Sequence, residues 1–272
     1  MKKTKKNKLQ LKTPKTIKYG IIIGSGDFDY EQHKHDEKSL ETPYGRIMVD
    51  ILDYEGIEIA LIARHGHNIH YPPHQTNYRG NIEAMDRLGV EYILATCSLT
   101  SINPHISPGE CVLLEDFVDF TKARFYTFHQ DGAQPAHVDM NEPYCAHLRQ
   151  ALKNQADASL QCPEKEIICV AMEGPREETR AEARFFQKMN WDATSMTTVP
   201  EVILAKEKGM CYASVGIITL QGKSTVTNPI ALQENVLNAR RSQIIKLFLR
   251  TFKDEPLTHD ACTCRQALCY YK

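Results

Sequence analysis

Long apolar runs, a large net charge and internal repeats are all missing from this sequence, and each absence excludes a class of protein. No apolar run approaches the roughly 18–20 residues that a membrane-spanning helix needs, so we expect no membrane partner. The formal net charge is only -1, so no overall field draws the chain to nucleic acid. The start of the chain has no hydrophobic core of a secretory signal, and we therefore expect a cytoplasmic protein.

An internal linker is missing as well, so the 272 residues are expected to form one domain with a tail at each end. Residues 1–18 carry eight lysines and no acidic residue, which predicts a disordered basic tail. Residues 19–255 form the expected domain, and residues 256–272 form a tail that contains cysteine. A targeting or RNA-binding role for the basic tail stays open at this point.

Nine cysteines are present, and three of them crowd the end of the chain as Cys262, Cys264 and Cys269. In a reducing compartment the six others, which are scattered, are expected to be buried thiols. The terminal three either bind a metal or form a redox pair. Two closely spaced cysteines without a second pair are a weak zinc signal, so no metal site is assigned.

Short β-rich runs alternate with segments of helical spacing along most of the chain. The predicted strands are 19–23, 47–54, 57–63, 91–97, 111–117, 166–172, 194–198 and 211–220, and the predicted helices are 77–88, 143–156, 179–189, one that begins near Pro200, and 232–253. Glu55-Gly56 separates the second and third strands as a hairpin turn. The alternation predicts an α/β fold with a mixed, largely parallel sheet flanked by helices.

Polar residues follow several of these strands at the point where each strand ends. They are short hydroxyls, two arginines and one histidine, with glycines beside them: Ser25, Arg64, His65, Ser98, Thr100, Arg176, Thr197 and Thr198. Ligands of α/β proteins bind beyond the carboxyl ends of the strands. Glycine lets backbone N–H groups approach an anion, hydroxyls donate to it, and arginine grips two oxygens at once. The set predicts an oxyanion site, although a single hydroxyl in such a place is commonly a helix cap.

Two rival sites are weaker. Gly222-Lys223-Ser224 follows a strand, but its spacing from Gly216 is one residue too long for a nucleotide-binding P-loop. Four histidines lie close together, at His65, His67, His70 and His74. Proline interrupts that segment, and neither an HExxH pattern nor a nearby carboxylate accompanies it, so no metal is expected there.

Five longer motifs stand out from the rest of the chain. They are Thr42-Pro43-Tyr44-Gly45, Ala63-Arg64-His65-Gly66-His67, Pro72-Pro73-His74-Gln75-Thr76-Asn77-Tyr78-Arg79, Glu173-Gly174-Pro175-Arg176 and Met196-Thr197-Thr198-Val199-Pro200-Glu201. Together they resemble the methylthioadenosine and methylthioinosine phosphorylase branch of the purine nucleoside phosphorylase family. The terminal Cys262-Thr-Cys264 also resembles the tail of some microbial members, in which such cysteines can form disulfides.

The resemblance implies a single-domain nucleoside phosphorylase fold and a homotrimer. It implies a glycosyltransferase of purine salvage, a pentosyltransferase that uses inorganic phosphate as co-substrate and needs no cofactor. By motif, the phosphate would accept from the hydroxyls of Ser25 and Thr197 and from the backbone amides of Cys97 and Ser98. Arg64 and His65 would form its cationic clamp. Met196 would contact the sugar, and His137 would reach the 5′ pocket of a neighbouring subunit.

The base-binding end departs from the family pattern. The family usually places an acid or asparagine after the long strand to help protonate the leaving purine, but Leu220 stands there, within a segment that ends at Gly222. Glu177 and Glu178 stand where an apolar or aromatic residue usually follows Gly-Pro-Arg. Either glutamate is a candidate catalytic acid, or the pair is simply a solvated helix start. The turn after Thr96 also carries bulkier residues than usual.

The expected substrate is therefore 5′-methylthioadenosine, methylthioinosine or a 6-oxopurine nucleoside, converted to free base and pentose 1-phosphate. The alternative is a catalytically impaired paralogue that binds phosphate or nucleoside without turnover. The apolar Leu220 at the base-reading position motivates that alternative.

Overall fold

The computed structural model describes residues 16–24, 28–67, 71–130, 134–156, 165–222 and 231–270. Within these residues, the strands are β1 (Tyr19–Ile23), β2 (Lys34–Thr42), β3 (Gly45–Tyr54), β4 (Ile57–Ala63), β5 (Tyr92–Ser101), β6 (Cys111–Phe120), β7 (Ala136–Val138), β8 (Glu166–Met172), β9 (Ala193–Ser195), β10 (Cys211–Gln221) and β11 (Leu268–Tyr270). The helices are α1 (Tyr78–Leu88), α2 (Ala146–Gln155), α3 (Arg180–Lys188), α4 (Glu201–Glu207) and α5 (Glu234–Asp254). None of these described helices is long and apolar enough to cross a membrane.

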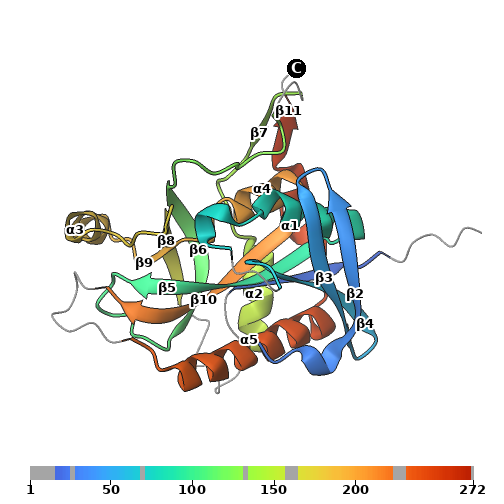
Figure 1. Ribbon diagram of the computed structural model, residues 1–272, viewed down its shortest axis with the longest axis horizontal. Coiled ribbons are helices and arrows are strands. Elements are labelled where there is room, and N and C mark those ends of the chain that lie inside the picture. Colours follow the sequence, from blue (N-terminus) through green and yellow to red (C-terminus); the bar gives the residue numbers. More distant parts are fainter. Residues whose placement is uncertain are drawn as a thin grey trace, which may run out of the picture.

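Most of the strands form one mixed sheet, in the order β10-β6-β8-β9-β5-β1-β4-β3-β2. β10 pairs parallel with β5 and antiparallel with β6, so β10, β6, β8, β9 and β5 close into a ring. β1, β4, β3 and β2 continue the sheet from β5 as an open extension. Helices lie on both sides of the sheet (Figure 1), so the predicted α/β fold with a mixed sheet is confirmed.

Both faces of the central strands are buried, and the alternation of side chains shows how. Ile21 and Ile23 of β1 pack in one apolar cluster with α2 and α5, whereas Ile22 packs in another with α1 and α4. Successive side chains of a strand point to opposite faces, and continuous apolar runs are typical of strands covered on both sides. The core therefore has two layers, one on each face of the sheet.

The predicted hairpin between β3 and β4 is confirmed, since the two strands pair antiparallel around Glu55 and Gly56. These two residues have positive φ values of 50° and 86°, as a tight two-residue turn requires. β2, at the edge of the sheet, was not predicted. Its sequence KHDEKSLET is mostly polar and no residue in it is fully buried, so it lacks the apolar pattern on which the strand predictions depend.

Both ends of the expected domain extend further than the sequence boundaries at residues 19 and 255. Ile17 is buried in the core, and its N–H donates to the Leu88 carbonyl at 3.0 Å. Beyond α5, Leu257 and Cys264 are buried. The last strand, β11, pairs with β7 in a two-stranded ribbon that projects from the body of the molecule (Figure 1). The segment after residue 255 is therefore a part of the fold as far as Tyr270.

Candidate active site

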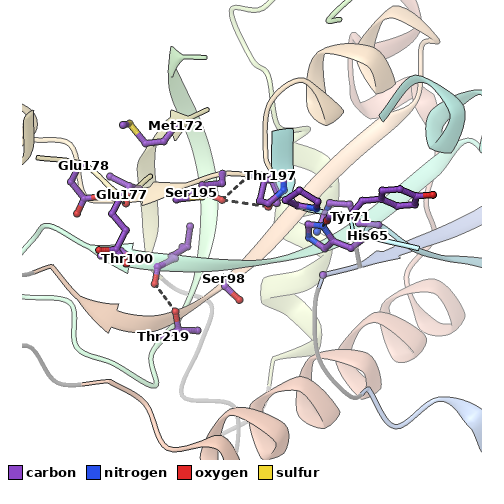
Figure 2. Close-up of a pocket in the computed structure, with 17 residues that line it drawn as sticks. His65, Tyr71, Ser98, Thr100, Met172, Glu177, Glu178, Ser195, Thr197 and Thr219 are labelled. Atoms are coloured by element: carbon purple, nitrogen blue, oxygen red, sulfur yellow. Dashed lines mark hydrogen bonds between the residues drawn. The ribbon is translucent and has the colours of Figure 1, made fainter. Parts of the chain in front are cut away.

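A cavity of about 410 Å³ opens where several strands of the sheet end. Residues at the ends of six strands form its wall: one follows β1, two follow β4, and the others lie at the ends of β5, β8, β9 and β10. In chain order they include Gly24, Arg64, His65, Ser98, Thr100, Met172, Ser195 and Thr219. The predicted convergence of polar strand ends therefore occurs. Figure 2 shows His65 at one end of the cavity and Glu177 and Glu178 at the other.

Arg64 is fixed in the wall by a buried carboxylate. Its Nε donates to Glu201 Oε2 at 2.6 Å and its Nη2 to Glu201 Oε1 at 2.7 Å, and both side chains are almost fully buried. Nη1 donates to the Thr96 carbonyl at 2.7 Å. Burial lowers the pKa of Arg64, but the negative charge of Glu201 outweighs it and holds that pKa above its ordinary value. The arginine is thus a permanent, oriented cation.

The guanidinium group of Arg64 also has N–H donors that form no hydrogen bond with a described residue. Its bonds to described residues take three of the five N–H donors that an arginine has, which leaves two for a ligand. Gly24 stands beside it, because a side-chain carbon at that position would lie 3.4 Å from Nη1. The Gly24 N–H is itself fixed by the Thr96 hydroxyl at 2.9 Å.

His65 and Thr197 line the same cavity as Arg64. His65 Nδ1 lies 2.8 Å from the Tyr71 carbonyl oxygen, and since a carbonyl only accepts, this nitrogen carries a proton and donates. The Thr197 hydroxyl lies 3.5 Å from that of Ser195 (Figure 2). Ser98 is exposed to the cavity from β5. The arrangement is a cation, an imidazole and short hydroxyls around one volume, which suits an oxyanion.

Several residues that the sequence assigned to the site or its strand ends, Thr198 among them, do not line the cavity. Ser25 is outside the described residues, so its place is not described. The Cys97 side chain is buried and does not line the cavity, and burial raises the pKa of its thiol to about 11. The contact expected of this residue is through its backbone amide. Arg176 turns to solvent and forms two hydrogen bonds with Glu182, at 2.7 and 2.8 Å. His137 lies in the projecting β7–β11 ribbon.

The two glutamates at the far end of the cavity differ in how they are held. Glu178 is partly buried, and its Oε2 accepts a hydrogen bond from the Thr194 hydroxyl at 3.3 Å. Glu178 also lines a smaller adjoining cavity of about 110 Å³, with Leu220 and Gly222. Glu177 is exposed, and its carbonyl accepts from Arg176. Glu178 is therefore a carboxylate that the fold holds in the cavity wall.

The end of β10 carries a register shift that changes which side chain reaches the main cavity. Ile218 pairs with Leu99 and Leu220 with Thr100, so Thr219 is an extra residue between them. A bulge of this kind re-aims the side chains beside it. Thr219 lines the main cavity, whereas Leu220 lines the smaller one. Leu220, which stands at the expected base-reading position, thus lines the smaller cavity, and its neighbour Thr219 lines the main one.

Met196 lies in the cavity wall against a glycine that cannot be replaced without strain. Gly174 has a φ of 70°, a conformation that L side chains rarely adopt. A side-chain carbon there would lie 2.7 Å from Met196 Sδ. The glycine of the Glu-Gly-Pro-Arg motif therefore lets the Met196 side chain take its place in the wall.

Sequence reasoning assigned no role to Glu201, Thr194 or Thr219. Glu201 stood at the end of a quoted motif, and an acid within the apolar run Val199–Ala205 was the signal that could have marked it as a buried ion-pair partner. Thr194 and Thr219 gave no signal. The described cavity wall carries no cluster of metal ligands, and the described residues that could hold a metal ion are four cysteines outside this wall.

Comparison with known proteins gives one consistent relationship. The family model of the phosphorylase superfamily matches residues 18–253. A probable 6-oxopurine nucleoside phosphorylase from Thermococcus kodakarensis is 43% identical over 258 residues, which are 91% of this chain and 96% of that protein. An S-methyl-5′-thioadenosine phosphorylase from Pyrococcus furiosus is 38% identical over 92% of this chain and 97% of its own.

The solved structures agree with the sequence relatives. A variant of adenosine/methylthioadenosine phosphorylase from Schistosoma mansoni, in complex with methylthioadenosine, has a TM-score of 0.80 and 28% identity, covering 93% of this chain and 97% of that one. The fold thus matches that of the sequence relatives' family. The chain therefore belongs to the phosphorylase superfamily, in the branch of methylthioadenosine and 6-oxopurine nucleoside phosphorylases.

Proposed function

We propose that this protein phosphorolyses purine nucleosides, 5′-methylthio forms among them, to the free base and a pentose 1-phosphate. It is then a pentosyltransferase of purine salvage with inorganic phosphate as co-substrate and no further cofactor. The observation that carries the proposal is one cavity with a carboxylate-braced arginine at one end and a positioned glutamate at the other. Relatives named for 6-oxopurine nucleosides, methylthioadenosine and methylthioinosine support this substrate class.

Phosphate binds at the end of the cavity that carries Arg64. Two N–H donors of this arginine and the hydroxyls of Ser98 and Thr197 match the acceptor oxygens of a phosphate, and His65 adds a further polar contact. We include the Ser25 hydroxyl in this set because of its position in the family motif. The bond between the sugar C1′ and the base breaks with positive charge on the sugar. The bound phosphate stabilises that charge, and one of its oxygens then bonds to C1′.

The base binds at the other end of the cavity, with the sugar against Met196 between the two. The electron pair of the broken bond goes to the purine, and a proton on its N7 makes it a better leaving group. Glu178 is the proposed acid, because Thr194 fixes its carboxyl group at the cavity wall. A positioned acid typically contributes ~10²–10⁴-fold in rate.

We also propose the oligomeric state and the compartment that the resemblance to this family implies. The active unit is a homotrimer in the cytoplasm that does not act on nucleic acid. His137 lies in the exposed β7–β11 ribbon, away from its own cavity, and this placement supports a contact with the nucleoside of a neighbouring subunit.

A phosphorolysis assay tests the proposal, with adenosine, inosine, guanosine and their 5′-methylthio forms as substrates. We expect phosphate-dependent release of base from at least one of them. Glu178→Gln should lower kcat by ~10²-fold or more, whereas Glu177→Gln, its exposed neighbour, should retain activity close to wild type.

One result would contradict the proposed reaction, and another would contradict only the choice of Glu178 as the acid. A folded protein that turns over none of these nucleosides, yet binds phosphate, would instead be the catalytically impaired paralogue. Equal losses in the Glu177 and Glu178 variants would remove the assignment of the acid while leaving the reaction in place.

A further inference from the structure

Four cysteine side chains meet at one point of the fold, far from the cavity. The Sγ atoms of Cys145, Cys211, Cys262 and Cys264 all lie within 4.8 Å of one another. Cys145 caps the start of α2, Cys211 is the first residue of β10, and the other two belong to the segment between α5 and β11. Three of the four are buried and Cys262 is half-buried.

We propose that these four thiols bind one zinc ion as a closed structural site. Four sulfur ligands at ~2.3 Å from a tetrahedral Zn²⁺ lie about 3.8 Å from one another, within the spread of this cluster. The Cys211 and Cys262 sulfurs are 3.3 Å apart, and all four cysteines are free thiols in the structure. Tetrahedral sites with four sulfur ligands favour zinc or iron, and a buried set with no open position is typical of structural zinc.

The surroundings are suited to the charge of such a site. Zn²⁺ with four thiolates has a net charge of about −2, which nearby cations and N–H dipoles must offset. Lys206 is buried, and its Nζ lies 3.8 Å from Cys264 Sγ. His259 Nδ1 lies 3.6 Å from Cys211 Sγ, and Cys145 sits at the positive end of the α2 dipole.

Lys206 gives an independent reason to expect thiolates here. A buried ammonium group is costly unless an anion accompanies it. Among the described residues, Lys206 Nζ donates to the Glu142 carbonyl at 2.7 Å and lies beside the Cys264 sulfur, and no described carboxylate pairs with it. A zinc-bound thiolate supplies the missing negative charge, and the ion displaces one proton from each of the four thiols as it binds.

The ion would join the C-terminal segment to α2 and to the sheet. Cys145 N–H donates to the carbonyl of Tyr212, next to Cys211, so α2 and β10 are already in contact there. The two tail cysteines add the segment that leads to β11 and the projecting ribbon. The cluster lies at the amino end of β10, whereas Thr219 lines the cavity near its carboxyl end. Zinc should therefore act on stability rather than on kcat.

This proposal revises the expectation of no metal, because the sequence presented only one close cysteine pair. The partners, Cys145 and Cys211, come from positions far along the chain that folding brings to Cys262 and Cys264. The same thiols could instead be oxidised to two disulfides, with loss of two hydrogens per bond to an external oxidant. Zinc binding and oxidation are mutually exclusive, so one experiment separates them.

The test is the metal content of the full-length protein, purified with a thiol reductant in medium that contains zinc. We expect about one zinc per chain, released when a thiol-modifying reagent is added. Cobalt(II) added to the demetallated protein should give the intense visible bands of a tetrahedral tetrathiolate. Cys264→Ser should lose the zinc and lower the Tm, while kcat stays near wild type.

Cys269→Ser is the matched control, since this cysteine is exposed, lies in β11 just beyond the segment that carries Cys262 and Cys264, and is outside the cluster. This variant should bind as much zinc as the wild-type protein and have the same Tm. If Cys264→Ser does not fold, the cobalt titration of the wild-type chain still decides the point. Protein that holds no zinc and takes up no cobalt while its thiols are reduced would overturn the proposal. Two disulfides that persist under the same reductant would overturn it as well.

Discussion

Arg64 and Glu201 form a two-pronged, buried ion pair across the base of the cavity, with N–O distances of 2.6 and 2.7 Å. Tyr212 adds a third bond to the same carboxylate, since its hydroxyl donates to Glu201 Oε1 at 2.6 Å. The pair joins the end of β4 to the start of α4. It fixes the plane of the guanidinium group before any anion arrives, so that an anion meets an oriented arginine.

Removing the charge of Glu201 should therefore harm both stability and phosphate binding. Glu201→Gln leaves a buried arginine without its counter-ion, and loss of one partner of a buried pair costs ~3–5 kcal/mol. Urea unfolding should show that loss, and the KM for phosphate should rise. Tyr212→Phe, which removes a single hydrogen bond, should cost only ~0.5–1.5 kcal/mol. A Glu201→Gln protein with wild-type stability and phosphate KM would refute this role.

Gly174 supports Met196, and its replacement tests the sugar-binding wall. Gly174→Ala adds a carbon 2.7 Å from Met196 Sδ at a φ of 70°, so the methionine must move. We expect a higher KM for the nucleoside and a lower Tm. Gly56→Ala is the control, because its φ is 86° but a side-chain carbon there meets nothing within 4 Å. If both variants change the Tm alone, backbone strain and not the Met196 contact is responsible.

The bulge in β10 predicts which side chain meets the base. Thr219→Leu adds bulk to the main cavity, and overpacking of ~1–3 kcal/mol should raise the KM for nucleoside about ten- to hundred-fold. Leu220→Met keeps its volume in the smaller cavity and should leave that KM unchanged. Steady-state kinetics at saturating phosphate measure both variants. The opposite pattern would show that Leu220 faces the base, as its place in the sequence suggested.

The cluster of polar residues at the proposed phosphate end could be predicted from the sequence, because these residues share one simple position in it. Arg64, His65, Ser98 and Thr197 lie in or just after strands, and folding brings these strand ends around one cavity. The same reasoning chose Arg176, which instead pairs with Glu182 on the surface. The position of a residue after a strand determines where its backbone lies. For a long side chain such as that of Arg176, a local salt bridge determines the direction in which the side chain points.

Three features could not be foreseen from the sequence, each for a physical reason. A one-residue bulge decides between Thr219 and Leu220, and nothing in the local sequence marks where a register shift occurs. The partner of Arg64 lies 137 residues away along the chain, so its role depends on tertiary packing. Edge strand β2 was missed for a third reason, since an exposed polar strand carries no apolar alternation.

The start of α3 makes the stability of the protein sensitive to acid. Two hydrogen bonds from Arg176, then the backbone N–H of Thr179, lower the pKa of Glu182 from 4.5 to about 2. The carboxylate also completes a capping box with Thr179. Because its pKa in the folded state is lowered, Glu182 contributes stability that is fully present above pH 4.5. That contribution is lost as the pH falls from about 4.5 to about 2.

Glu182→Gln should remove this pH dependence while the amide oxygen still accepts from Thr179. The Arg176 and Glu182 side chains are 56% and 30% exposed, so solvent screening limits the difference from wild type to about 1 kcal/mol or less above pH 4.5. Urea unfolding of both proteins at steps of pH measures it, and the two curves should converge toward pH 2. Glu41→Gln, which breaks an exposed pair with Arg46 on another element, is the control. A Glu182→Gln difference that stays constant down to pH 2 would mean that the ionised carboxylate is not the group that stabilises this helix start.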